Sequence, residues 1–194
     1  MLKPHALPAV LKQFNLVAVH GPWWRSIAFH YLLANPAEPL WAAGSKINGA
    51  RFTTKGSFDS LYLSWHPTTT LAEVDSLVML PSGPAPLQTS PLTLFVINGI
   101  VTRVLDLTDA SILDALETSE QEMGGPWAKT ATPPTQTLAQ AVYDSGTIAG
   151  IQYASAKAGG QKNLMVFPER IKVPAPDYLT VYDSFGDLHQ RIGT

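Results

Sequence analysis

The chain of 194 residues contains no cysteine. This absence excludes a disulfide framework, a thiolate nucleophile and cysteine-ligated zinc or iron–sulfur sites. Charged residues are also scarce, at 14%, whereas hydrophobic residues make up 45%. That balance is typical of a folded domain with a sizeable core rather than of a disordered chain. At this length we expect one domain over residues 1–194.

An excess of positive charge is also missing. Thirteen lysines and arginines stand against fifteen aspartates and glutamates, which gives a net charge of −2. Without a basic surface to hold a phosphate backbone, nucleic-acid binding is not expected as a main role. No apolar run reaches the ~18 residues of a membrane span, and residues 1–14 lack the apolar block of a signal peptide. We therefore expect no membrane partner and a cytoplasmic location.

The signature motifs of several enzyme classes are not found. The sequence has no Gly-x-x-x-x-Gly-Lys loop, no Gly-x-Gly-x-x-Gly after a strand and no Gly-x-Ser-x-Gly elbow. The five histidines show no His-Glu-x-x-His spacing, so no metal site is expected. A Ser-His-Asp triad stays open, because its members come together in space rather than in sequence.

Sixteen prolines and fourteen glycines divide the chain into short elements. Apolar runs and alternation predict strands over 16–20, 60–65, 92–97, 101–107, 148–153 and 163–167, with a last short one at 171–173. Helical spacing predicts helices over 7–14, 68–80, 108–122 and 135–143, while 27–33 is ambiguous. The intervening loops are expected at 44–56 (a loop or bulged hairpin), 81–91, 124–134 and 155–161. The polar tail 174–194 is expected to be partly ordered.

The order of these elements indicates the fold class. Strands and helices are mixed without strict strand–helix–strand alternation, and Asn98-Gly99 between two apolar runs predicts a hairpin turn. We therefore predict an α+β fold with a mixed, mainly antiparallel sheet and flanking helices.

Five polar residues stand out from apolar and aromatic surroundings. They are Arg25, Arg51, Tyr62, Glu73 and Ser155. Two arginines suit a phosphate-bearing ligand, because guanidinium groups bind such oxygens in a bidentate manner. A carboxylate near them can stabilise a developing positive charge or position a nucleophile.

Each of these residues also has a purely structural interpretation. The stretch Thr70-Leu71-Ala72-Glu73 has the pattern of a capping box, in which the glutamate caps a helix start. Arg51 between glycines is typical of a surface loop, and Arg25 can stack on the preceding tryptophan. Tyr62 alternates with leucines as an ordinary strand residue does. A serine such as Ser155 in a polar loop usually has no special role.

His20 and the tryptophans also have structural interpretations. His20 follows an apolar run, and a lone histidine there is more often a core residue than a member of a site. Packing in the core or at its rim is the expected role of four tryptophans, Trp23, Trp24, Trp41 and Trp127.

Taken together, the motifs resemble the RES domain family, which is named for its Arg, Glu and Ser. The resemblance rests on Arg25, Gly49-Ala50-Arg51-Phe52-Thr53-Thr54-Lys55-Gly56, Leu61-Tyr62-Leu63-Ser64, Thr70-Leu71-Ala72-Glu73-Val74, and Gly150-Ile151-Gln152-Tyr153-Ala154-Ser155 followed by Asn163-Leu164-Met165-Val166-Phe167. It covers residues 24–167, leaving 174–194 as a C-terminal tail.

The resemblance implies a fold similar to that of ADP-ribosyltransferase toxins and a function as the toxin of a bacterial toxin–antitoxin pair. Members of the family destroy NAD by hydrolysis or phosphorolysis of the nicotinamide–ribose bond, with NAD as substrate and no cofactor. Their partner is a helix-turn-helix antitoxin of the Xre type, which inserts a C-terminal segment into the active-site cleft. Transfer of ADP-ribose to a protein and a non-catalytic binding module are the alternative functions.

The resemblance also implies roles for individual residues. Catalytic roles fall to Arg25, Tyr62 and Glu73, and substrate-binding roles to Arg25, Arg51, Tyr62 and Ser155. Glu73 would stabilise the oxocarbenium-like ribose left by nicotinamide, and the two arginines would hold the pyrophosphate. Tyr62 would stack on nicotinamide or hydrogen-bond near it, and Ser155 would bond the ribose or the diphosphate. Water or phosphate would then attack.

Overall fold

The computed structural model describes residues 1–33, 37–87, 89–171 and 176–193. Its strands are β1 (Val17–His20), β2 (Trp23–Ala28), β3 (Leu61–Ser64), β4 (Leu77–Leu80), β5 (Gly83–Pro86), β6 (Leu92–Asp106), β7 (Gly150–Ala154), β8 (Lys162–Val166), β9 (Tyr178–Val181) and β10 (Gln190–Gly193). Its α-helices are α1 (Leu7–Leu11), α2 (Ala43–Asn48), α3 (Pro67–Glu73), α4 (Ala110–Ala115), α5 (Glu120–Gly124), α6 (Pro134–Asp144) and α7 (Pro168–Ile171). Two short 3₁₀ turns are η1 (Phe29–Leu33) and η2 (Trp127–Lys129).

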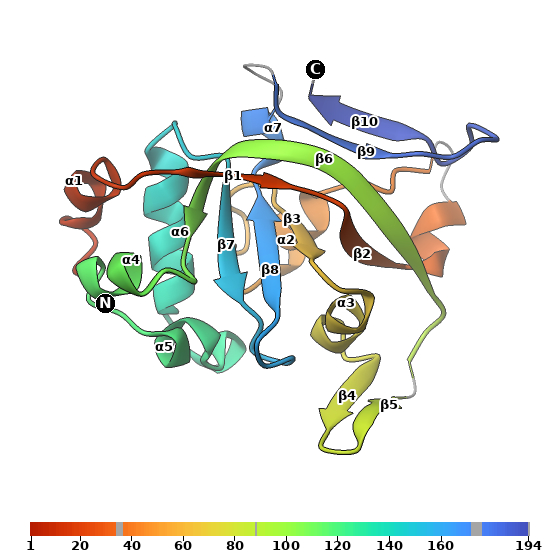
Figure 1. Cartoon of the computed structure of the whole chain (residues 1–194), viewed down its shortest axis with the longest axis horizontal. Helices are drawn as coiled ribbons and strands as arrows, with labels where there is room; N and C mark the ends of the chain where they lie inside the picture. The colour runs from red at the N-terminus through yellow and green to blue at the C-terminus, as the bar shows by residue number, and fades with distance from the viewer. Residues whose placement is uncertain (34–36, 88, 172–175, 194) are drawn as a thin grey trace.

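Eight of the strands form one sheet, which organises the molecule (Figure 1). Its strand order is β10-β9-β6-β2-β3-β8-β7, and β1 pairs with β6. Most pairings are antiparallel, but β6 also runs parallel to β7, so that β6, β2, β3, β8 and β7 close into a ring. The predicted α+β class with a mainly antiparallel sheet and flanking helices is confirmed.

The core consists of two apolar clusters on opposite sides of β3, β8 and β7. Successive side chains of a strand point to opposite faces, so Met165 and Ile151 pack on one side and Leu164 and Val166 on the other. The longest helix, α6, covers the first side with its apolar stripe. This predicted helix and the predicted hairpin of β7 and β8 are confirmed.

The predicted hairpin at Asn98-Gly99 is wrong, because β6 continues through both residues without turning. Gly99 lies opposite Leu179 of β9, and an added Cβ at this position would collide with the carbonyl oxygen of Tyr178. The glycine therefore allows β6 and β9 to approach each other closely and does not form a turn.

Gly99→Ala is expected to lower the free energy of unfolding by about 1–3 kcal/mol, because β9 must move away from β6. Urea denaturation measures the change. Gly159→Ala is the matched control, since an added Cβ there meets open space and needs no unusual backbone angle. Equal stability of the two variants would show that the contact with β9 is not tight.

The predicted helix over 68–80 is shorter and begins earlier. α3 starts at Pro67, after the N-cap His66, and its last residue is Glu73. The backbone of Asp75 then adopts a positive φ of 54°, which ends the helical path. The chain continues into the antiparallel hairpin β4–β5, so the predicted loop over 81–91 contains a strand. Figure 1 shows this hairpin extending away from the main sheet beyond α3.

Several other boundaries differ from prediction. The first part of the expected loop over 44–56 belongs to α2, which is followed by its C-cap Gly49 with a φ of 80°. The expected helix over 108–122 is divided into α4 and α5, because Glu117 has a φ of 51° and Ser119 caps a new helix. Ile171 belongs to α7 rather than to a strand, and 172–173 lie outside the described residues. In the tail, β9 and β10 form an antiparallel pair.

Candidate active site

A cavity of about 580 Å³ lies against the sheet, a volume typical of small-molecule sites. It is lined by several residues each of β2, α2, β3 and α3, together with single residues of η1, η2, β7 and β8. Of the five residues singled out in the sequence, four line this cavity: Arg25, Arg51, Tyr62 and Glu73. The structure therefore gathers residues that are far apart in sequence around one space.

Glu73 is held rigidly at the end of α3. Its Oε1 accepts two hydrogen bonds, from Ser155 Oγ and from Asn163 Nδ2, both at 2.7 Å. Within the described residues, Oε2 accepts no hydrogen bond. The capping-box interpretation is wrong, because the glutamate ends the helix instead of beginning it. Of the two carboxylate oxygens, the protein therefore fixes Oε1, and Oε2 has no such partner among the described residues.

Ser155 lies behind Glu73 rather than among the residues that line the cavity. Its hydroxyl donates to Glu73 and accepts from the backbone N–H groups of Lys157 and Ala158, at 3.2 and 3.0 Å. A hydroxyl has one proton and two acceptor positions, so all three are engaged. The contact of Ser155 with a substrate stays a prediction, and its observed bonds serve to hold the carboxylate.

Asn163 is a site residue to which the sequence analysis gave no role. Its side chain is buried, and its Oδ1 accepts from Ser64 Oγ at 2.7 Å while its Nδ2 donates to Glu73. Cross-strand register pairs Asn163 with Ser64 on one side and with Tyr153 on the other. The signal in the sequence was a lone amide at the start of an otherwise apolar strand.

Tyr62 lines the cavity, but its hydroxyl is already engaged in hydrogen bonds within the protein. Its hydroxyl accepts from the backbone N–H of Phe52 and shares a hydrogen bond with Thr53 Oγ1, both at 3.0 Å. Burial raises the pKa of Tyr62, so the phenol is neutral. This residue connects β3 to the segment that carries Arg51.

Tyr153 stands beside the carboxylate as a second neutral phenol. Burial, and next the negative charge of Glu73, raise the pKa of Tyr153 well above its ordinary value. The phenol therefore keeps its proton at neutral pH.

The two arginines bring positive charge to the cavity. Arg25 donates from Nη2 to the carbonyl of Trp41 at 2.6 Å, and its buried Nε has no hydrogen-bond partner among the described residues. Burial lowers the pKa of Arg25 to about 10, which still leaves it charged at neutral pH. Arg51 donates from Nη1 to the carbonyls of Met123 and Gly125, both at 2.9 Å. Among the described residues, neither forms a salt bridge with a carboxylate.

The tryptophans have different environments. Trp23 is fully buried, as expected for core packing, whereas Trp41 is 37% exposed and lines the cavity together with Trp127. His20 is exposed and does not line the cavity. At the cavity edge, Lys157 forms an ion pair with Asp75.

In the described ranges, no three His, Asp or Glu side chains lie close enough together to hold a metal ion. No helix in this part of the chain has the length and apolar character that crossing a bilayer requires.

Comparison with known proteins places this arrangement in a family. A search among curated proteins finds no match. A chain in the crystal structure of the M. tuberculosis MbcT–MbcA toxin–antitoxin complex has a similar fold, with a TM-score of 0.67 and 18% identity over 97% of this chain and 92% of that one. The family model of the RES domain matches residues 22–183, which include every residue of the site described above. The chain therefore belongs to the RES domain family.

Proposed function

We propose that the protein is the toxin of a toxin–antitoxin pair and that it cleaves NAD at the nicotinamide–ribose bond. The observation that carries the proposal is the carboxylate of Glu73, which lies in a cavity that also holds Arg25 and Arg51. Among the described residues, one oxygen of this carboxylate is fixed by hydrogen bonds and the other is free, and neither arginine has an acidic partner. Family membership and the similarity to a chain of a toxin–antitoxin complex support the toxin role.

The positive charge of the arginines selects the substrate class. A dinucleotide carries a diphosphate, and guanidinium groups bind phosphate oxygens with charge-assisted hydrogen bonds. The buried Nε of Arg25 has no hydrogen-bond partner in the part of the chain that the structure describes, so a phosphate oxygen would satisfy a donor that is otherwise desolvated at a cost. Arg51 adds a second positive charge to the lining of the same cavity.

The free oxygen of Glu73 faces the ribose in this proposal. The C1′–N bond breaks with both electrons passing to the pyridinium nitrogen, so nicotinamide leaves as a neutral base. The ribose is left with oxocarbenium character, which a nearby carboxylate stabilises. An oxygen of water or phosphate then bonds C1′ and its proton is released. Ser155 and Asn163 position the carboxylate, and the rings of Tyr62 and Tyr153 border the same space.

Incubation of the purified protein with NAD tests the proposal. Free nicotinamide is followed by chromatography, and the second product is identified by mass with and without inorganic phosphate. ADP-ribose identifies water as the acceptor, and a phosphorylated ADP-ribose identifies phosphate. Label that becomes attached to a protein would identify ADP-ribosyl transfer instead. Absence of nicotinamide under all these conditions would contradict NAD cleavage.

The partner in this proposal is a small helix-turn-helix antitoxin of the Xre type, encoded beside the toxin. Co-expression of that protein is expected to restore growth of cells that express the toxin and to restore their NAD content. Growth arrest with an unchanged NAD content would contradict the link between toxicity and NAD cleavage.

A further inference from the structure

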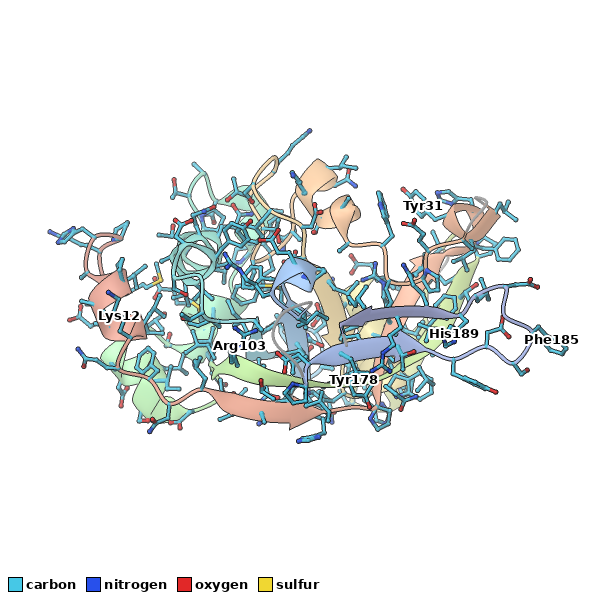
Figure 2. The ribbon with its side chains drawn as sticks, turned by 90° about the horizontal axis from the view of Figure 1, so that it is seen from above. Lys12, Tyr31, Arg103, Tyr178, Phe185 and His189 are labelled. Carbon is cyan, nitrogen blue, oxygen red and sulfur yellow. The ribbon has the colours of Figure 1, made fainter. Side chains whose placement is uncertain are left out.

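The cavity has an aromatic region that the proposed cleavage chemistry does not use. Tyr31 of η1 and Trp41 both line the cavity, and their ring centroids lie 6.1 Å apart with planes inclined by 36°. Both rings meet water, since Tyr31 is 53% exposed and Trp41 37% exposed. Figure 2 shows Tyr31 at the end of the molecule from which the β9–β10 hairpin tip with Phe185 also projects. Exposed aromatic rings at a cavity are suited to contact a planar apolar surface.

The indole of Trp41 is held in place by its surroundings. Its ring lies against Gly44, where an added Cβ would be 3.2 Å from the nearest ring carbon. The backbone carbonyl of Trp41 accepts the hydrogen bond from Arg25. Tyr31 is supported in turn by His30, whose ring centroid is 4.1 Å away. A surface that is already ordered costs little conformational entropy when a ligand binds to it.

We propose that Tyr31 and Trp41 form the subsite for the adenine base of the dinucleotide; this inference rests on the proposed function. NAD carries two bases joined through a diphosphate. If the nicotinamide ribose lies at Glu73 and the diphosphate at Arg25, the adenosine half continues toward Trp41, because Arg25 directly contacts the Trp41 backbone. A purine stacks on aromatic rings through its π-face without requiring base-specific hydrogen bonds.

Other aromatic residues fit this role less well. Trp127 is a single ring on the segment that Arg51 holds, and it is more buried than Trp41. Tyr182 and Phe185 are more exposed, at 75% and 90%, but they do not line the cavity. Tyr182 therefore provides a matched control, namely an exposed aromatic ring away from the site.

The test compares two substrates that share the nicotinamide ribose. Nicotinamide mononucleotide lacks the adenosine half, so it cannot use the proposed subsite. Tyr31→Ala and Trp41→Ala are each expected to lower kcat/KM for NAD about 10-fold, mainly through a higher KM, and to leave the cleavage of nicotinamide mononucleotide unchanged. Trp41→Phe is expected to recover most of the loss. Tyr182→Ala is expected to match the native protein on both substrates.

A parallel measurement does not depend on catalysis. Calorimetric titration with ADP-ribose is expected to show about 10-fold weaker binding to Trp41→Ala, whereas binding of ribose 5-phosphate is unchanged. An unchanged KM for NAD, an equal loss on both nucleotides, or unchanged ADP-ribose binding would each overturn the subsite. If the native protein releases no nicotinamide, cleavage fails as the function, and the ADP-ribose titration still decides whether an adenine subsite exists.

Discussion

Glu73→Gln is expected to lower the rate of NAD consumption about 10²- to 10³-fold, which is the range found when one preorganised electrostatic contact to a transition state is removed. Glutamine keeps an oxygen that can accept the hydrogen bonds from Ser155 and Asn163. The variant therefore loses the negative charge beside the ribose without losing the local structure. Release of nicotinamide under saturating NAD measures the effect, which should fall on kcat rather than on KM.

The control for this variant is Asp75→Asn. Asp75 also lies at the cavity, only two residues from Glu73, but its carboxylate is 75% exposed and paired with Lys157. Its neutralisation is expected to change turnover by less than about twofold, because an exposed ion pair contributes little. Turnover by Glu73→Gln equal to that of Asp75→Asn, at equal thermal stability, would remove the glutamate from the mechanism.

Asn163→Asp is expected to lower NAD consumption at neutral pH about 100-fold, which is comparable to losing a buried hydrogen bond to a charged group. The change removes the amide donor at 2.7 Å from Glu73 Oε1 and places a second carboxylate there. At acidic pH a proton shared by the two carboxylates recreates a donor to Glu73. The loss of activity relative to the native protein should therefore shrink as the pH falls, and pH profiles of kcat measure this.

Ser64→Ala serves as the graded comparison for this residue. It removes only the hydroxyl that orients the amide from the far side, so a smaller loss with no new dependence on pH is expected. If Asn163→Asp and Ser64→Ala gave the same pH profile, Asn163 would be a structural residue of the sheet and not a positioning residue for the carboxylate.

From the sequence, most residues of the site could be predicted, but the hydrogen bonds between them could not. Arg25, Arg51, Tyr62 and Glu73 were identifiable because polar residues in apolar surroundings need a reason, and the structure brings all four to one cavity. The bonds of Ser155 were not predictable, since they depend on the hairpin of β7 and β8 bringing its connecting loop next to the end of α3. The local pattern of residues along the chain contains no information about such contacts between distant segments.

The fold shows the same division between local and long-range information. The alternating strand over 60–65 and the helix over 135–143 were predictable, because each carries its own periodicity. Gly99 was misinterpreted because the pair Asn98-Gly99 favours a turn locally, whereas the need for a glycine comes from β9, some eighty residues later. Val78 and its neighbours suggested a longer helix, but they lie in the partly exposed strand β4. Tertiary pairing overrode local preference in both places.

Each arginine of the cavity supports the cavity wall in addition to its proposed role in binding the ligand, and this limits which residues can replace it. Arg25 fixes the backbone at Trp41, and Arg51 fixes the carbonyls of Met123 and Gly125, just before Trp127. In the proposed function, an incoming anion would meet the same planar groups that hold the backbone beside Trp41 and Trp127 in position. Lysine carries the same charge but lacks the planar guanidinium group with its several N–H donors. Its single ammonium group would therefore have to bind either the ligand or the backbone carbonyls of the cavity wall. Replacing either arginine by lysine would therefore weaken the cavity wall as well as the proposed binding of an anion.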